Sequence, residues 1–284
     1  MEIPKNPVDR FMYWMQERQR IFHRKEAGND RPWTDDPILH EYKFTNVFRQ
    51  QDRVTIELNN RYSIRDSMRT LAWKISMFRM FNWPETYDEL VKHSMLTKWN
   101  ERTAKKVLRK MKADKRQIFT GAYIITNSGS TRPKIELAAE ALTELWNGLH
   151  TIVNEITRVN SLEYACLVLQ RYPMMGKFTS YEVVTDMRHT KILNNATDIY
   201  TWANPGPGAK RGLNRIFRGH RGKKPAGGTQ QYISEMQALM NDIKVIDKKR
   251  LEMRDIEHSL CEFDKYERVR LGEGRPRSKY HEKS

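Results

Sequence analysis

Hydrophobic residues recur along most of the chain at the three- and four-residue spacing of an amphipathic helix. In the first such stretch the apolar positions are Phe11, Trp14, Met15, Ile21 and Phe22. The repeated pattern predicts a nearly all-helical protein. The predicted helices cover residues 4–27, 37–60, 64–80, 84–95, 99–113, 134–159, 162–170, 176–187, 231–246 and 255–269.

A few segments interrupt this pattern. Glycine and proline within residues 28–32 end the first helix, and Asp36 followed by Pro37 is typical of a new helix start. Residues 120–132 are small, β-branched and punctuated by glycine, which predicts a loop or short hairpin. The tail from Gly272 is basic and rich in turn residues. With neither a repeat nor a linker, we expect a single compact body over the whole chain.

Composition narrows the class of protein. Hydrophobic residues make up 38% of the 284 residues, enough for a real core. The sequence contains no apolar run of about 18 residues, so we expect no membrane span. Cys166 and Cys261 are too few for a disulfide framework or a zinc site, which suits a reducing cytoplasm. Because the N-terminus also lacks a signal peptide, we expect a soluble intracellular protein.

The net charge of +16 implies an anionic partner, for which nucleic acid is the usual candidate. The charge is clustered: residues 203–225 carry seven basic side chains and no acid, and residues 101–116 carry eight basic side chains. Clustering favours a binding footprint over a uniformly basic surface. Double-stranded DNA is therefore the expected partner.

Residues 202–216 resemble the hairpin and second helix of a helix–hairpin–helix unit. In that motif a glycine-rich turn and a helix N-terminus present N–H groups to a DNA phosphate. An ordinary turn before a basic helix is the alternative interpretation. The motif predicts as DNA-binding residues Gly206, Gly208, Lys210, Arg211 and Arg215.

Polar faces occur on other predicted helices. In residues 33–53 the polar positions that recur at helical spacing are Lys43, Asn46, Gln50 and Arg53, with Arg49 and Asp52 beside them. In residues 256–268, His258, Glu262 and Lys265 share one face, whereas Asp264 lies on another. Taken alone, each pattern is typical of a solvated helix surface.

Together these segments resemble a known family. The motifs are the stretch Trp33–Arg53, residues 176–186, the Pro-Gly-Pro-Gly-Ala hairpin and the Cys-Glu-Phe-Asp-Lys-Tyr stretch. They resemble the phage DNA base-hypermodification proteins named α-glutamyl/putrescinyl thymine pyrophosphorylases, which are related to amino acid:DNA transferases. The resemblance covers roughly residues 30–280, with the motif order kept. It implies an all-α, DNA-glycosylase-like fold and a location in the cytoplasm of the infected bacterial host.

The resemblance also implies a reaction. A kinase phosphorylates 5-hydroxymethyluracil in DNA, and a second enzyme displaces phosphate or pyrophosphate with an amine such as glycine. This chain is expected to be that second enzyme. The reaction requires a flipped base, cations on the departing phosphate, a proton acceptor and a seat for the amine.

Roles for individual residues follow from the resemblance. The expected ligands of phosphate or an amino-acid carboxylate are Arg49, Arg53 and Lys265, and the candidates for the base are Asp52, Asp186, Glu262 and Asp264. The expected contacts to the target base are Asn46 and Asn127 at the uracil edge and Phe178 or Tyr181 on the ring, with Arg275 at an oxygen pair of the DNA.

Two other functions remain open. A non-catalytic DNA-binding factor for packaging or replication would explain the charge and the hairpin. A base-excision glycosylase would share the fold, but downstream of the hairpin the chain has Gly227 and Gly228 rather than a glycosylase-type catalytic aspartate. No cofactor or metal motif is present, so we expect none.

Overall fold

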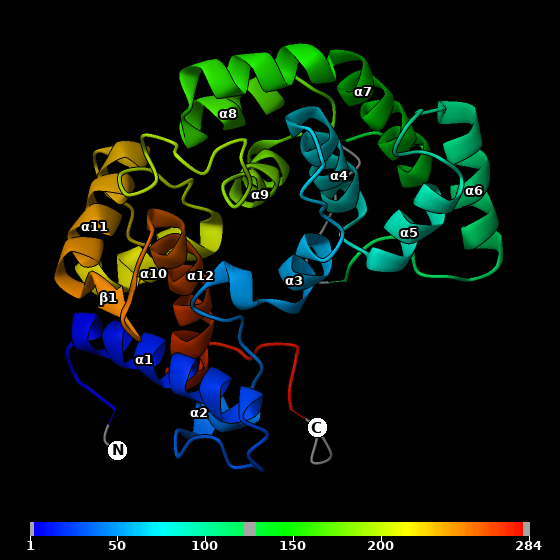
Figure 1. Ribbon diagram of the computed structural model, residues 1–284. Helices are drawn as coiled ribbons and strands as arrows, with labels where there is room; N and C mark the ends of the chain where they lie inside the picture. Colours follow the sequence, from blue (N-terminus) through cyan, green and yellow to red (C-terminus); the bar gives the residue numbers. More distant parts are fainter. Residues whose placement is uncertain (1–2, 122–128, 281–284) are drawn as a thin grey trace. The chain divides into compact units, whose positions relative to one another are not determined.

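The computed structural model describes residues 3–121 and 129–280 and is mostly helical (Figure 1). The chain divides into two compact units, which we call unit 1 (Met1–Asp52 with Ile199–Ser284) and unit 2 (Arg53–Asp198). The all-α class predicted from the periodicity is confirmed. The single compact body stays a prediction.

Unit 1 combines both ends of the chain. Its helix α12 packs against α1 and α10, and a two-residue antiparallel pair, β1–β2, precedes α12 (Figure 1). The elements of unit 1 are α1 (Pro7–Glu26), α2 (Pro37–Glu41), η1 (Arg49–Gln51), α10 (Pro207–Arg218), α11 (Gly228–Ile243), β1 (Val245–Ile246), β2 (Lys249–Arg250) and α12 (Met253–Arg270).

Unit 2 is helical in its described residues. Its long helix α7 packs against α4, α6 and α8, and Trp73 contacts the rings of Trp99 and Trp146 at centroid distances of 5.3 and 5.0 Å. The elements of unit 2 are α3 (Arg53–Asn59), α4 (Met68–Phe81), α5 (Pro84–Lys92), α6 (Glu101–Ala113), α7 (Lys134–Val159), α8 (Leu162–Leu169) and α9 (Lys177–Met187).

Local signals explain many helix boundaries. Asn6 caps α1, and Asp36 caps α2 by accepting hydrogen bonds from the N–H groups of Ile38 and Leu39 at 2.9 and 3.0 Å. The predicted helix 134–159 coincides with α7, which ends where Asn160 adopts the left-handed conformation. Most of the predicted 120–132 loop lies outside the described residues.

The long helix predicted over residues 37–60 is wrong. The structure ends α2 at Glu41, runs irregularly from residue 42 to residue 48, and resumes with η1 and α3. Arg18 donates from Nε to the carbonyl oxygens of Phe44 and Thr45 at 3.3 and 3.1 Å. Side chains from elsewhere thus satisfy backbone groups that a helix would have paired internally. Tertiary contacts have replaced the helix that the apolar spacing indicated.

Two glycines allow α10 and α12 to pack closely. A Cβ added to Gly208 would lie 2.3 Å from Sγ of Cys261, and one added to Gly212 would lie 2.5 Å from the carbonyl oxygen of Leu260. Neither distance is tolerable for a real side chain. Gly208 therefore serves helix packing, and its approach to a DNA phosphate stays a prediction.

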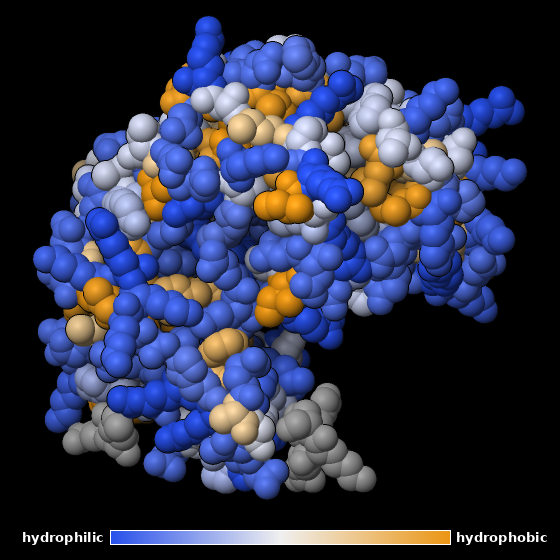
Figure 2. Space-filling model, viewed as in Figure 1, coloured by the Kyte–Doolittle hydropathy of each residue, from blue (hydrophilic) through white to orange (hydrophobic). Residues whose placement is uncertain are grey.

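The visible surface is largely hydrophilic (Figure 2), in keeping with a composition in which 30% of residues are charged. None of the helices in the described ranges has the length and apolar character needed to cross a bilayer.

Candidate functional site

A cluster of buried and half-buried polar side chains lies in unit 1 between α1, residues 43–52 and α12. Arg18 of α1 is 4% exposed and donates from Nη2 to Oδ1 of Asn46 at 2.6 Å, besides its bonds to the backbone of the same segment. Its Nη1 is buried and has no hydrogen-bond partner among the residues that the structure describes. The Nη1 group of Arg18 therefore has N–H donors inside the cluster that can bind a ligand.

Hydrogen bonds of Asn46 connect the two ends of the segment 46–52. The N–H of Asn46 donates to Oδ1 of Asp52 at 3.0 Å, and Nδ2 of Asn46 donates to the carbonyl oxygen of Gln51 at 2.7 Å. Both ends of the Asn46 amide therefore have protein partners. This geometry favours a role in bracing the segment over the predicted reading of a uracil edge.

Asp52 faces His258 of α12. Oδ2 of Asp52 lies 3.5 Å from Nε2 of His258, and the side chains are 19% and 18% exposed. Within the described ranges Nε2 has no partner in hydrogen-bonding geometry, so the contact is an ion pair when the imidazole is protonated. The helical spacing placed His258 on the same face as Glu262 and Lys265, but no role was predicted for it.

Each partner shifts the other's pKa. Burial alone would raise the pKa of Asp52, but His258, the Asn46 N–H and Arg49 together lower it below its ordinary value. Burial alone would lower the pKa of His258, but Asp52 outweighs it and raises this pKa. Each side chain therefore stabilises the charged form of the other.

Glu262 and Lys265 complete the cluster. Oε2 of Glu262 accepts a hydrogen bond from the N–H of Thr45 at 3.3 Å, and the other carboxylate oxygen pairs with Nζ of Lys265. Burial would lower the pKa of Lys265, but Glu262 raises it above the ordinary value. The side chain of Lys265 is 37% exposed and that of Glu262 only 5%, so the lysine is the member of this pair that solvent and ligands can reach.

Asp264 faces the other side of α12, as its helical position predicts. Its Oδ2 lies 2.7 Å from Nε of Arg211 and its Oδ1 lies 2.9 Å from Nε of Arg215. Arg215 also contacts Glu273 at 2.6 Å, and its side chain is 4% exposed. These residues join α12 to α10, and the buried charge of Arg215 is neutralised within the protein.

At the N-terminus of α10, one backbone N–H is already hydrogen-bonded. The N–H of Gly206 donates to Oε1 of Glu257 at 3.0 Å, so a carboxylate of the protein stands where the hairpin motif would place a phosphate. Lys210 is half-buried over the ring of Tyr232. Exposed cations follow α10 instead, in residues 219–224.

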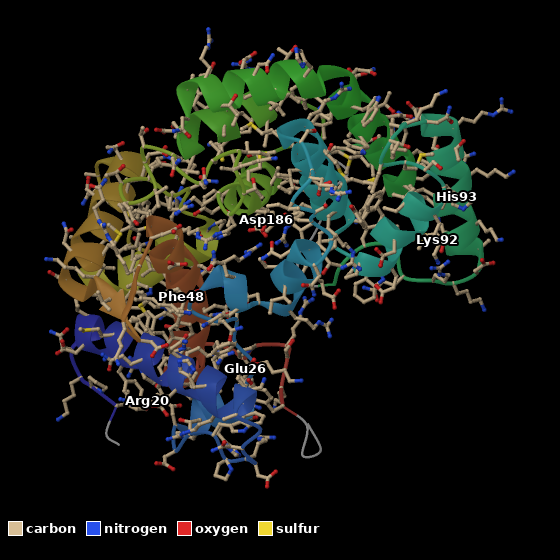
Figure 3. All side chains as sticks on the ribbon, viewed as in Figure 1. Arg20, Glu26, Phe48, Lys92, His93 and Asp186 are labelled. Atoms are coloured by element: carbon tan, nitrogen blue, oxygen red, sulfur yellow. The ribbon has the colours of Figure 1, made fainter. Side chains whose placement is uncertain are left out.

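The remaining predicted residues are found in both units. In unit 2, Asp186 on α9 (Figure 3) pairs with Arg79, Tyr181 is buried, and Phe178 is 48% exposed. Arg53 and Arg275 are exposed, and Asn127 lies outside the described residues.

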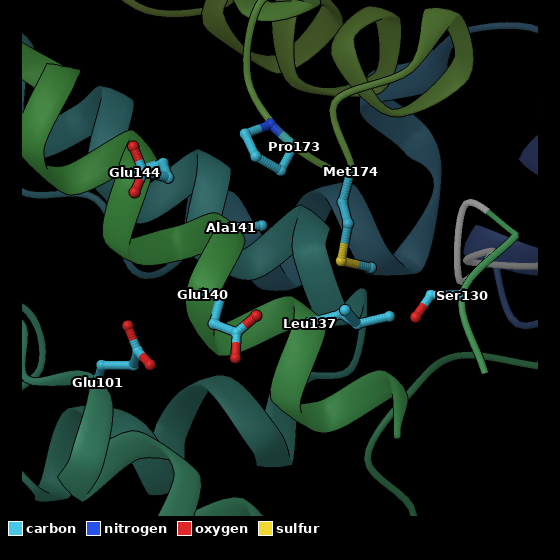
Figure 4. Close-up of a pocket in the computed structure, with 8 residues that line it drawn as sticks. All are labelled: Glu101, Ser130, Leu137, Glu140, Ala141, Glu144, Pro173 and Met174. Carbon is cyan, nitrogen blue, oxygen red and sulfur yellow. The ribbon is translucent and has the colours of Figure 1, made fainter. Parts of the chain in front are cut away.

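A cavity of about 590 Å³ in unit 2 holds none of the predicted residues (Figure 4). Its lining includes Glu101, Glu140 and Glu144, which would repel a phosphate. Glu101 and Glu140 both pair with Lys105. Among the residues described, no group of three or more potential metal ligands is found.

The His258–Asp52 contact predicts a specific titration. The imidazole should titrate above its ordinary pKa of about 6.5 in the native protein. In Asp52→Asn the midpoint should fall, because burial then dominates. The stability that His258 adds is present at low pH and is lost as pH rises through its raised pKa. Nuclear magnetic resonance of the imidazole protons measures the midpoint, and an unchanged value in Asp52→Asn would contradict the pairing.

Comparison with known proteins identifies the family. A family model described as "5-hmdU DNA kinase, helical domain" matches residues 5–275. A protein of Bacillus phage SP10, named 5-hmdU DNA kinase, is 29% identical over 288 residues, covering 91% of this chain and 44% of the phage protein. The chain thus spans less than half the length of that relative. No solved structure matches.

These findings confirm the resemblance to the phage thymine-hypermodification proteins and correct the reaction drawn from it. The expected transfer of an amine to phosphorylated DNA is wrong, because both names denote a kinase, and glycine loses its support as a co-substrate. The chain belongs to the family of the 5-hmdU DNA kinase helical domain.

Proposed function

We propose that this chain binds DNA and receives 5-hydroxymethyl-2′-deoxyuridine for phosphorylation at its hydroxyl group. The name of the phage relative supplies the reaction class. The observation that carries the proposal is the cluster in unit 1: Asp52 faces His258 of α12 and lies on the same segment as Asn46, which Arg18 holds. Phosphoryl transfer to a hydroxyl needs both a proton acceptor and cations.

Asp52 is the proposed proton acceptor. A hydroxyl attacks phosphorus as its proton leaves, and a carboxylate within hydrogen-bond reach accepts that proton. The lowered pKa keeps Asp52 ionised, and His258 holds its carboxylate in place. Lys265 and the Nη1 group of Arg18 provide positive charge for the phosphoryl oxygens. A nucleotide is the proposed phosphoryl donor.

The target base has to leave the helical stack to reach this site. Asp52 and His258 are each less than one-fifth exposed, which favours contact with a base that has left the stack over one that stays paired in a duplex. The duplex itself is proposed to contact the exposed basic residues 219–224 together with Arg211, which is 41% exposed. This assignment moves the predicted DNA contact from the hairpin glycines to the residues that follow α10.

A binding comparison tests the proposal. The hydroxymethyl group adds one hydrogen bond to a charged acceptor, worth about 1.5–3 kcal/mol, or roughly tenfold or more in affinity. Fluorescence anisotropy with duplexes that differ only in one 5-hydroxymethyluracil or thymine should show this preference. Asp52→Asn should reduce it, whereas Asp35→Asn, an exposed aspartate of unit 1, should preserve it. Equal affinity of the wild-type protein for both duplexes would refute the proposal.

A further inference from the structure

A second group of cations in unit 1 surrounds two aromatic rings. Nζ of Lys25 lies 5.1 Å from the ring centroid of Trp33 and 5.3 Å from that of Tyr280. Arg31 lies 5.6 and 5.2 Å from the same rings, and Nζ of Lys43 lies 5.3 Å from Tyr280. All these distances are within the reach of a cation–π interaction. We call these five residues the cation–aromatic cluster.

The backbone fixes both rings. Nε1 of Trp33 donates to the carbonyl oxygen of Asn29 at 2.7 Å, which sets the orientation of the indole. Tyr280 lies on a short antiparallel pairing in which its N–H donates to Glu41 at 3.0 Å and Lys43 donates to Ser278 at 3.0 Å. The two rings meet edge to face at 5.3 Å. The cations therefore gather on a preformed surface.

The lysines of the cluster are not neutralised. Over residues 3–121 and 129–280, neither Lys25 nor Lys43 forms an ion pair, and both are exposed. Burial and the charges of Arg18 and Lys43 lower the pKa of Lys25, while Glu26 opposes them. Nearby Lys279, in contrast, pairs with Glu41. The electrostatic repulsion between these clustered cations decreases when an anion binds.

We propose that the cation–aromatic cluster binds the phosphodiester backbone of DNA. The cations lie over the ring faces of Trp33 and Tyr280, so these faces are not free to stack on bases. The ammonium groups retain N–H donors for phosphate oxygens. Buried Arg18 links the cluster to the polar site, since its charge acts on Lys25 while it holds Asn46. The inference rests on the proposed binding of DNA but not on which base is recognised.

The dependence of DNA affinity on salt tests this site. Each phosphate contact contributes about 0.9 to the slope of log affinity against log salt, so Lys25→Gln with Lys43→Gln should reduce the slope by about 1.8. The loss of affinity should be equal for duplexes with 5-hydroxymethyluracil and with thymine. Lys25→Arg with Lys43→Arg should retain the wild-type slope, which separates charge from folding. Lys279→Gln is the matched control, because Glu41 already neutralises that lysine.

The outcomes separate the two proposals. A slope that stays at the wild-type value in the double glutamine variant, or that falls as much in Lys279→Gln, would overturn the cluster as a phosphate site. A wild-type protein that binds both duplexes equally would refute recognition of 5-hydroxymethyluracil and leave the slope measurement valid. Circular dichroism of each variant confirms that the helices are intact.

Discussion

Replacing Asp264 with asparagine is expected to lower the free energy of unfolding by about 3–5 kcal/mol. Asp264 is fully buried and pairs with Arg211 and Arg215. The variant would leave Arg215, whose side chain is 4% exposed, with Glu273 as its remaining carboxylate partner. Removing the fully buried carboxylate of this network leaves buried positive charge less well compensated. Urea unfolding measures the change.

The control is Asp242→Asn on the exposed face of α11, which should change stability by no more than about 0.5 kcal/mol. Replacing Asp264 and Arg215 together with leucine and methionine should recover much of the lost stability, because it removes both charges. If Asp264→Asn folds as stably as the wild type, the carboxylate is not structural, and its predicted role as a base returns.

The second large effect is expected for Asp186→Asn in unit 2. Oδ1 of Asp186 accepts a hydrogen bond from Nη2 of Arg79 at 2.9 Å, and the two side chains are 1% and 2% exposed. Asn82 and Thr55 also accept hydrogen bonds from Arg79. Loss of the carboxylate charge should again cost about 3–5 kcal/mol of unfolding free energy.

A matched pair in the same unit serves as the control. Asp88 binds Arg61 with a similar geometry, but its side chain is 46% exposed. Asp88→Asn should therefore cost only about 0–1 kcal/mol, since solvent screens the pair. Similar losses in the two variants would contradict the buried-pair account, as would a fully stable Asp186→Asn protein.

The sequence predicts the helices well where local signals decide them. The apolar spacing of residues 134–159 and the cap formed by Asp36 both agree with the structure. The helix prediction fails for the segment after Glu41 because the hydrogen-bond partners of its backbone come from elsewhere in the chain, above all from Arg18. Apolar periodicity carries no information about such long-range hydrogen bonds.

For the candidate site, too, the sequence predicted some of the residues and missed a residue that long-range contacts bring in. The family resemblance selected Asp52, Glu262 and Lys265, which the structure places in one cluster. It missed Arg18, although a detectable signal exists: this arginine follows Trp14 by four residues and precedes Ile21 by three, so it lies on the apolar face of its helix. A charge in that position is expected to have buried partners.

The reaction could not be decided from the motifs. Phosphorylation occurs at the hydroxyl oxygen and displacement of the resulting phosphate occurs at the carbon that carries it, so both reactions act on the same exocyclic group of a base in DNA. Both need cations, a proton acceptor and an extruded base. Residues such as Asp52 and Lys265 suit either reaction, and only the family match separates the two.

A chemical trap can show whether the cluster in unit 1 receives the modified base. A duplex containing 5-formyl-2′-deoxyuridine carries an aldehyde in place of the hydroxymethyl group, and a nearby lysine amine forms an imine that cyanoborohydride reduces to a stable link. Lys265 is the amine of the cluster that solvent and ligands can reach. We expect peptide mass spectrometry to find the link at Lys265, and we expect Lys265→Arg to abolish it. Links confined to exposed lysines such as Lys223 and Lys224, with Lys265 unmodified, would contradict it.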